Sequence, residues 1–270
     1  MPYTDPYFRG FEPAFPDFWR VEEWKREFAE FSASKSAPNL MLLRIGNDHF
    51  GDFRRAIDGV NTVETQMADN DYALGEIVDA VAHSPFASDT EIVSVEDDSW
   101  DGIDHVDRNR SIALFAGPYV RQHALLSKRY TTVNLVRTIE EILGIGPIGL
   151  NDALAAPMSD IFDPTIATWS YQAIIPPVLH STKLPLPSAA HACIDFPKRS
   201  SEYWSGVMSG QDFSHSDRIN KAFARALWHG LKDRELYPAQ PVSGDDLRSN
   251  RQGLLSQVEA TRAGKCKVHN

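Results

Sequence analysis

A short apolar run in this chain ends in a dense acidic segment, and the two together limit the folds that the chain can adopt. Residues 92–95 (IVSV) are mostly β-branched and predict a buried strand. The twelve residues that follow, Glu96 to Asp107, contain six carboxylates and one histidine. So many like charges repel one another unless water or a shared cation neutralises them. Because ligands bind beyond the carboxyl ends of strands in open α/β sheets, we expect a metal and phosphate site here.

Apolar periodicity elsewhere predicts strands that alternate with amphipathic helices. Helical spacing predicts helices over 17–33, 63–82, 132–143 and 216–232, and apolar runs predict further strands at 40–45 and 111–116. Gly144 suits the position just after the third helix, and a threonine at its start can cap it. Such alternation is typical of an α/β fold with a largely parallel sheet flanked by helices. In that sheet, the polar residues after 40–45 and after 92–95 would lie at one edge.

The character of the sequence changes along the chain, and we expect three regions. Residues 1–163 carry the strand and helix patterns and predict the α/β domain. Residues 164–242 are rich in proline and predict an irregular, wrapping extension with one helix. Residues 243–270 are polar and predict a flexible tail.

Composition excludes several classes of protein. The 27 basic and 37 acidic residues give a net charge of −10, which argues against a nucleic-acid partner. The two cysteines, Cys193 and Cys266, form no CxxC pair, which argues against a disulfide framework and a thiolate zinc site. The sequence contains no run of ~18 apolar residues, so we expect no membrane span. No signal peptide is visible, so we expect a cytoplasmic protein, or an exported one if the true start lies upstream.

Five residues are candidates for the chemistry of the site. Asp97 and Asp98 stand where a strand ends, so both side chains can turn toward one ion as metal ligands. Carboxylate oxygens suit Mg, Ca or Mn as the bound metal, and a nearby imidazole makes Zn or Fe suitable as well. His105 could bind metal or protonate a leaving group, and Asp48 with His49 repeats this chemistry after another strand. The alternative for Asp97 and Asp98 is a solvated acidic turn. For Asp48 and His49 it is a polar turn, and for His105 it is a surface histidine that neutralises nearby acids.

Several motifs follow one another in a fixed order over residues 3–163. They are Asn47-Asp48-His49, Ala68-Asp69-Asn70-Asp71-Tyr72-Ala73-Leu74-Gly75, Glu96-Asp97-Asp98, Asp104-His105-Val106-Asp107, Gly117-Pro118-Tyr119-Val120 and Leu150-Asn151-Asp152-Ala153. In these motifs the chain resembles the alkaline phosphatase superfamily. The branch it resembles is the phosphoesterases that include bacterial phospholipase C and acid phosphatase.

This resemblance implies a metal-dependent phosphoesterase that acts on phosphate mono- or diesters. Asp97, Asp98 and Asp48 match its metal-binding positions, and the cofactor would be a divalent ion (Zn, Mn, Mg, Ca or Fe). His105 and His49 match positions near the phosphoryl group and would be the catalytic residues. The substrate would be a phosphate-ester small molecule or a phospholipid head group.

The chain also departs from the family's pattern. Relatives carry an N-terminal strand followed by Glu-Asn-Arg and a Ser or Thr nucleophile, and no Glu-Asn-Arg occurs here. Asn109 stands where the family often has a further histidine. The resemblance is therefore to the C-terminal portion, and it implies a hydrolase whose site is incomplete within this chain. The alternative is a noncatalytic or truncated module that binds metal or phosphate, or that pairs with a complementing chain or a second copy.

Overall fold

The structure of this chain is a computed structural model that describes five stretches of residues. These are 3–97, 111–187, 199–211, 221–232 and 235–237. The predicted site residues Asp98 and His105 lie outside the described residues. So do both cysteines and the whole of the tail predicted from residue 243 onward.

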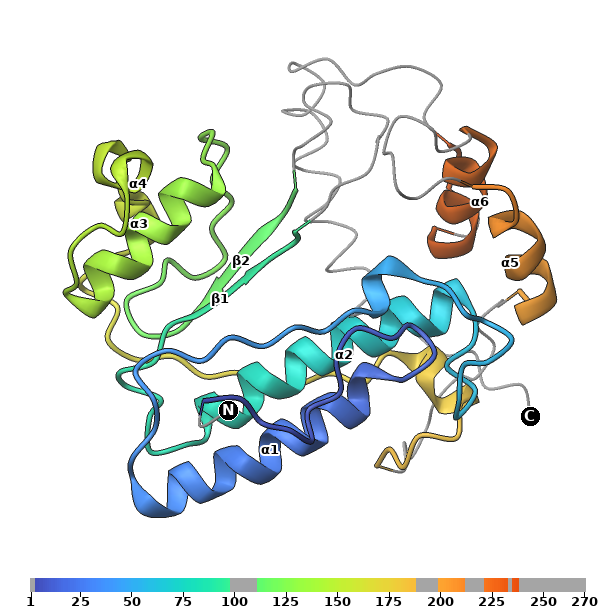
Figure 1. The fold of residues 1–270 in the computed structure, drawn as a ribbon, viewed down its shortest axis with the longest axis horizontal. Coiled ribbons are helices and arrows are strands. Elements are labelled where there is room, and N and C mark those ends of the chain that lie inside the picture. Colours follow the sequence, from blue (N-terminus) through green and yellow to red (C-terminus); the bar gives the residue numbers. More distant parts are fainter. Residues whose placement is uncertain (1–2, 98–110, 188–198, 212–220, 233–234, 238–270) are drawn as a thin grey trace, which may run out of the picture.

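Two long helices, α1 (Asp17–Ser34) and α2 (Val63–Ala82), form the base of the molecule and confirm two predicted helices. They lie side by side and run in the same direction, because the chain between them returns along their length (Figure 1). The Thr62 hydroxyl accepts from the amide of Thr65 (3.2 Å) and caps α2. Apolar side chains at helical spacing pack between the helices: Val21, Trp24, Phe28, Ala73, Ile77 and Val81.

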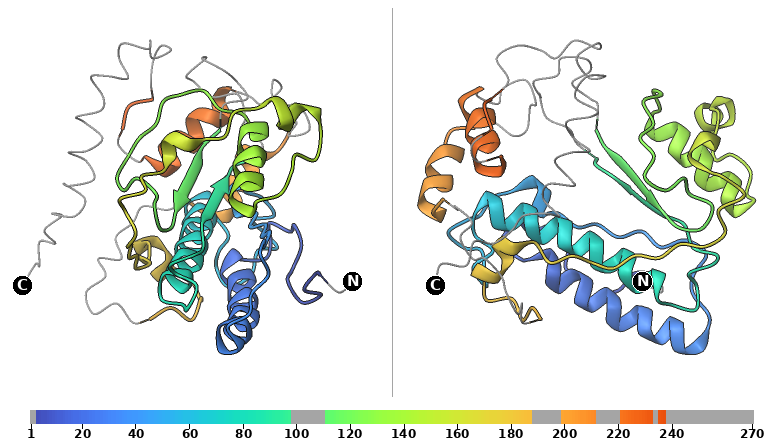
Figure 2. Two further views of the ribbon diagram at one scale, coloured as in Figure 1. Left: turned by 90° about the vertical axis from the view of Figure 1, so that its left-hand side faces the viewer. Right: turned by 180° about the vertical axis from the view of Figure 1, so that it is seen from behind.

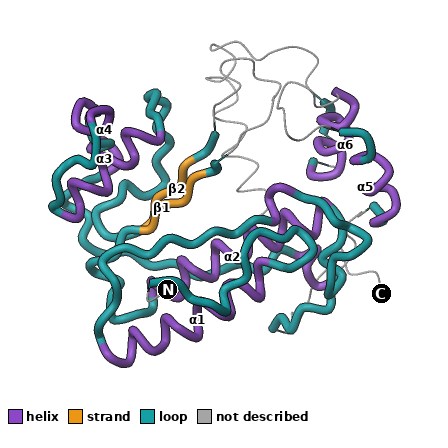
Figure 3. The backbone as a smooth tube through the Cα atoms, viewed as in Figure 1, coloured by secondary structure: helices purple, strands orange, loops and turns teal. Residues whose placement is uncertain are grey.

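The predicted strand at 40–45 is wrong in one respect: these residues are extended, but the structure assigns them no strand (Figure 3). Their side chains alternate as in a strand. Met41, Leu43 and Ile45 pack against the cluster between α1 and α2, and Leu40 and Leu42 are exposed. Periodicity therefore reported the extended backbone and its buried side correctly, but it carries no information on a hydrogen-bonding partner.

The strands β1 (Ile92–Val95) and β2 (Ala113–Ala116) pair antiparallel, with Ile92 opposite Ala116 and Val95 opposite Ala113. They form the only sheet among the described residues. The prediction of an α/β fold with a largely parallel sheet is therefore wrong. A parallel pair needs a crossover connection, usually a helix, and residues 96–112 carry no helical apolar pattern that could supply one.

A smaller unit covers one side of the strand pair. It contains α3 (Thr132–Leu143), which confirms a predicted helix, and the short α4 (Leu150–Leu154). Gly144 ends α3 in the left-handed conformation (φ 65°), as the sequence predicts. The unit packs on the strands through Val93 and Phe115 (Figure 2).

The proline-rich stretch after residue 163 runs back along α2. The backbone amide of Ala173 donates to Asp79 in α2 (2.6 Å), and Val178 and Leu179 enter the core. Two further helices follow, α5 (Ser201–Met208), which was not predicted, and α6 (Lys221–Leu231), which confirms the described part of the predicted helix. None of the helices in the described part of the chain has the length and apolar content to cross a membrane, as the sequence predicts.

Candidate metal centre

The centre of the candidate site is His49, on a short 3-10 turn (Asn47–His49) between the extended segment 40–45 and α2. Its Nε2 atom lies 3.5 Å from Asp97 Oδ1 and 3.9 Å from Asp48 Oδ2. The His49 and Asp48 side chains are 18% and 20% exposed, and that of Asp97 is 61% exposed. The site is therefore open to solvent on the Asp97 side and sheltered on the turn side.

Glu96 completes the group of donors. One ligand atom each from Asp48, His49 and Glu96 can be chosen so that all three lie within 4.8 Å of one another. Three carboxylates thus surround one imidazole, with Asp97 at the open side. Asp48 Oδ1 is buried and accepts no hydrogen bond from the described residues. A buried carboxylate oxygen without a donor is unfavourable unless a cation or water occupies it, so this donor set fits a divalent ion.

An arginine and an aromatic ring form the rim of the site. The Arg44 guanidinium lies 3.4 Å from Asp97 Oδ2 and 5.0 Å from the centre of the Phe11 ring. The Phe11 ring also meets the His49 imidazole edge to face at 5.1 Å. Gly46 permits this close approach, because a Cβ there would lie 3.0 Å from Phe11 Cδ2. Arg44 is exposed and could meet an anionic substrate.

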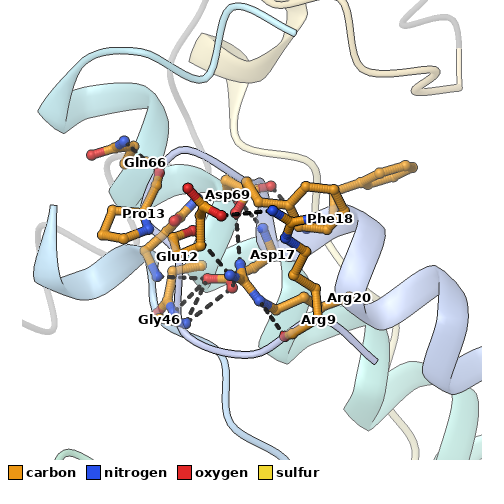
Figure 4. Close-up of polar contacts among 12 residues, drawn as sticks. Arg9, Glu12, Pro13, Asp17, Phe18, Arg20, Gly46, Gln66 and Asp69 are labelled. Carbon is orange, nitrogen blue, oxygen red and sulfur yellow. Dashed lines mark hydrogen bonds and ion pairs between the residues drawn. The ribbon is translucent and has the colours of Figure 1, made fainter. Parts of the chain in front are cut away.

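Behind the turn lies a buried polar network that joins α1 to α2 (Figure 4). Asp69 of α2 accepts hydrogen bonds from the amides of Asp17 (2.6 Å) and Phe18 (3.1 Å). The Asn47 Nδ2 atom donates to the same carboxylate (2.8 Å). Burial and, after it, the nearby charge of Asp17 raise the pKa of Asp69 to about 7, although these hydrogen bonds lower it.

The backbone after the turn has an uncommon conformation. Phe50 and Asp52 have positive φ angles of 53° and 46°, which non-glycine residues rarely adopt. Gln66 of α2 holds this backbone on both sides: it accepts from the Gly51 amide (2.9 Å) and donates to the Gly51 carbonyl (2.8 Å). Strained residues persist only where the surrounding structure fixes them, and they concentrate at functional sites.

The structure brings three of the predicted site residues together: Asp48, His49 and Asp97. They do not meet at the edge of a parallel sheet, as the sequence predicted. Asp97 follows β1, and the turn follows an extended segment that pairs with no other strand in the described part of the chain. Glu96 was counted in the acidic run but not as a site residue. Arg44 and the network around Asp69 were not singled out for the site, although an aspartate on the buried face of an amphipathic helix is a signal that could have found the network.

Comparisons of this chain with protein-family models, with curated proteins and with solved structures find no match.

Proposed function

We propose that this chain is a metal-dependent phosphoesterase-like hydrolase that acts on phosphate mono- or diesters. The observation that carries the proposal is the convergence of Asp48, His49 and Glu96 on one point, with Asp97 beside them. The ordered motifs that resemble the alkaline phosphatase superfamily support the same reaction class.

The donor set favours particular metals. Carboxylate oxygens alone suit Mg or Ca, and an imidazole in the set shifts the preference toward Zn, Mn or Fe. Asp48, His49 and Glu96 would hold the ion, and Asp97 would add a further oxygen from the open side. A bound divalent ion would neutralise charge on a phosphoryl oxygen and lower the pKa of a water molecule.

The remaining residues would orient the substrate and move protons. Arg44 lies at the open side and would meet the anionic phosphate, because a guanidinium pairs well with phosphate oxygens. As a ligand of the ion, His49 would stand next to the phosphoryl group. By the motif resemblance, Asp98 would be a second acidic ligand, and His105 would lie near the phosphoryl group and protonate the leaving group.

The test measures metal binding first and hydrolysis second. Titration of the chain with Mn²⁺ or Zn²⁺ should show binding that Asp48→Asn and His49→Ala each weaken by at least about tenfold, because loss of a ligand costs no less than loss of a residue that orients one. His83→Ala is the matched control, because the exposed His83 pairs with Asp79 at the C-terminal end of α2 and takes no part in the site. With metal present, the chain should hydrolyse p-nitrophenyl phosphate or its bis-ester. Equal metal affinity in all four proteins would refute the proposal.

A second candidate is a noncatalytic module that binds metal or phosphate. One observation favours it: among the described residues, no serine or threonine hydroxyl is hydrogen-bonded to Asp48, His49 or Asp97, so no nucleophile is positioned there. Metal binding without hydrolysis of either ester would support this candidate against the first. Light scattering in the same experiment would show whether a second copy pairs with the chain.

A further inference from the structure

We propose that Asp17 is the positioning residue of the candidate metal centre. Its carboxylate, at the start of α1, holds the turn that carries Asp48 and His49. This inference rests on the proposed function, and it concerns how the two ligands are held rather than which reaction they serve.

The Asp17 carboxylate is aimed at the backbone of the turn. It accepts hydrogen bonds from the backbone amides of Gly46 (3.0 Å) and Asn47 (2.8 Å). Those are the two amides directly before Asp48, so they set where the next two side chains leave the backbone. Figure 4 shows the Asp17 carboxylate with its contacts to Gly46. Asp17 is fully buried, so water cannot replace these bonds without moving the helix.

Asp17 itself is firmly held by residues of both helices. Arg20, one helical turn later, donates to Asp17 Oδ1 (2.8 Å). Arg20 is also buried, and its other N–H groups donate to backbone carbonyls of the preceding coil, those of Arg9, Gly10, Glu12 and Phe15. From α2, Asn70 Nδ2 donates to Asp17 Oδ2 (3.0 Å). The carboxylate thus has one fixed orientation, set by both helices and by the coil.

The turn is also held by two further side chains, those of Asp69 and Gln66. Asp69 holds the side chain of Asn47, while Asp17 holds its backbone. Beyond the turn, Gln66 fixes both polar groups of Gly51. The turn is therefore anchored just before and just after Asp48 and His49, and the positive φ of Phe50 lies between these anchors. A loop that served only to connect elements would not need anchors on both sides of the same two residues.

The decisive variant is Asp17→Asn, which keeps the volume of the side chain and replaces one acceptor oxygen with a donor. We expect the affinity for Mn²⁺ or Zn²⁺ to fall by about ten- to a hundredfold, as for other residues that orient ligands. In the metal-free protein, the imidazole NMR resonances of His49 should shift and broaden. Glu76→Gln is the matched control: it removes another α1–α2 contact, the pair with Lys25, which lies away from the turn.

The outcomes separate positioning from simple stability. If Asp17→Asn loses metal affinity and shifts His49 while Glu76→Gln, with comparable urea stability, does neither, the inference is supported. It is overturned if Asp17→Asn binds metal like the unaltered chain, or if both variants lose affinity in step with stability. If the unaltered chain binds no metal, the proposed function fails, and the His49 resonances still decide the inference.

A measurement on the unaltered chain covers the case in which Asp17→Asn does not fold. The amide protons of Gly46 and Asn47 should exchange with solvent as slowly as amides inside α1, because a buried carboxylate accepts from both. Exchange as fast as in exposed turns would overturn the inference without any variant.

Discussion

Replacement of Asp69 by asparagine should change how the stability of this protein depends on pH. Asp69 lies on the buried face of α2, where it meets Asp17 and Phe18 at the start of α1 and Asn47 in the turn. The Arg20 guanidinium belongs to the same network, and it pairs with Asp17 rather than with Asp69. Burial and the Asp17 charge raise the pKa of Asp69 from 3.8 to about 7.

Whether stability rises or falls with pH depends on which state, folded or unfolded, binds the proton more tightly. Because the folded pKa is the higher one, the folded state holds a proton on Asp69 at pH values where the unfolded state has lost it. The associated stability is fully present below about pH 4 and is lost as the pH rises through about 7. Each pKa unit corresponds to about 1.4 kcal/mol, so the full loss is on the order of 4 kcal/mol. Asparagine does not titrate and should remove this dependence.

The assay is urea unfolding of both proteins followed by tryptophan fluorescence, from about pH 4.5 to about pH 8.5. Fluorescence permits low protein concentrations, which matter because the sequence pI is about 5.3. Relative to Asp69→Asn, the unaltered chain should lose stability steadily up to about pH 7 and then level off. Parallel curves would contradict a raised pKa for Asp69, and a relative gain with pH would show that the three N–H donors outweigh burial and the Asp17 charge.

Three further changes test other parts of the fold. Glu64→Gln should lower the free energy of unfolding by about 1–3 kcal/mol, because the buried Glu64 accepts from Trp204 Nε1 (2.8 Å) and from the Arg199 amide (3.1 Å). An unchanged urea midpoint would contradict this prediction. Gly230→Ala should destabilise the protein by about 1–3 kcal/mol in the same assay, because the new Cβ would lie 2.6 Å from the fully buried Trp204 ring. Helix propensity alone would instead give a gain in stability, and such a gain would show that the ring can move. Burial raises the pKa of Glu91 to about 8, so the Glu91→Gln variant should be more stable than the unaltered chain above pH 8 and should lose this advantage toward acid pH. Equal urea midpoints of the two proteins above pH 8 would contradict this prediction.

The helices could be predicted from the sequence because their signals are local. The apolar spacing within α1, α2 and α3, and Gly144 after α3, lie within a few turns of the residues they describe. Sheet pairing could not be predicted in the same way. Periodicity identified 40–45, 92–95 and 111–116 as extended, but it does not say which of them share hydrogen bonds. The antiparallel pair was predictable only from the lack of a crossover helix between its strands.

The site shows the same division between local and distant information. Asp48, His49 and Asp97 could be chosen because each stands directly after an apolar run, and the structure places them together. Asp17 entered the prediction only as the start of a helix. Its contact with Gly46 joins residues 29 positions apart, and its contact with Asn70 joins residues 53 apart. No pattern within one element encodes such a contact, so the ligands were found from the sequence and their support was not.

The hydrogen bonds of the carboxylates decide which of them can serve as ligands. A carboxylate has about four acceptor positions, and the Asp17 oxygens accept from Arg20, Gly46, Asn47 and Asn70. A cation would have to displace these N–H donors and would meet the Arg20 guanidinium as well. Asp48, by contrast, keeps one buried oxygen without a donor among the described residues, and Asp97 faces solvent. N–H donors fill the acceptor positions of Asp17 but not those of Asp48 and Asp97, so a divalent ion should bind beside His49 and not among Asp17 and its partners.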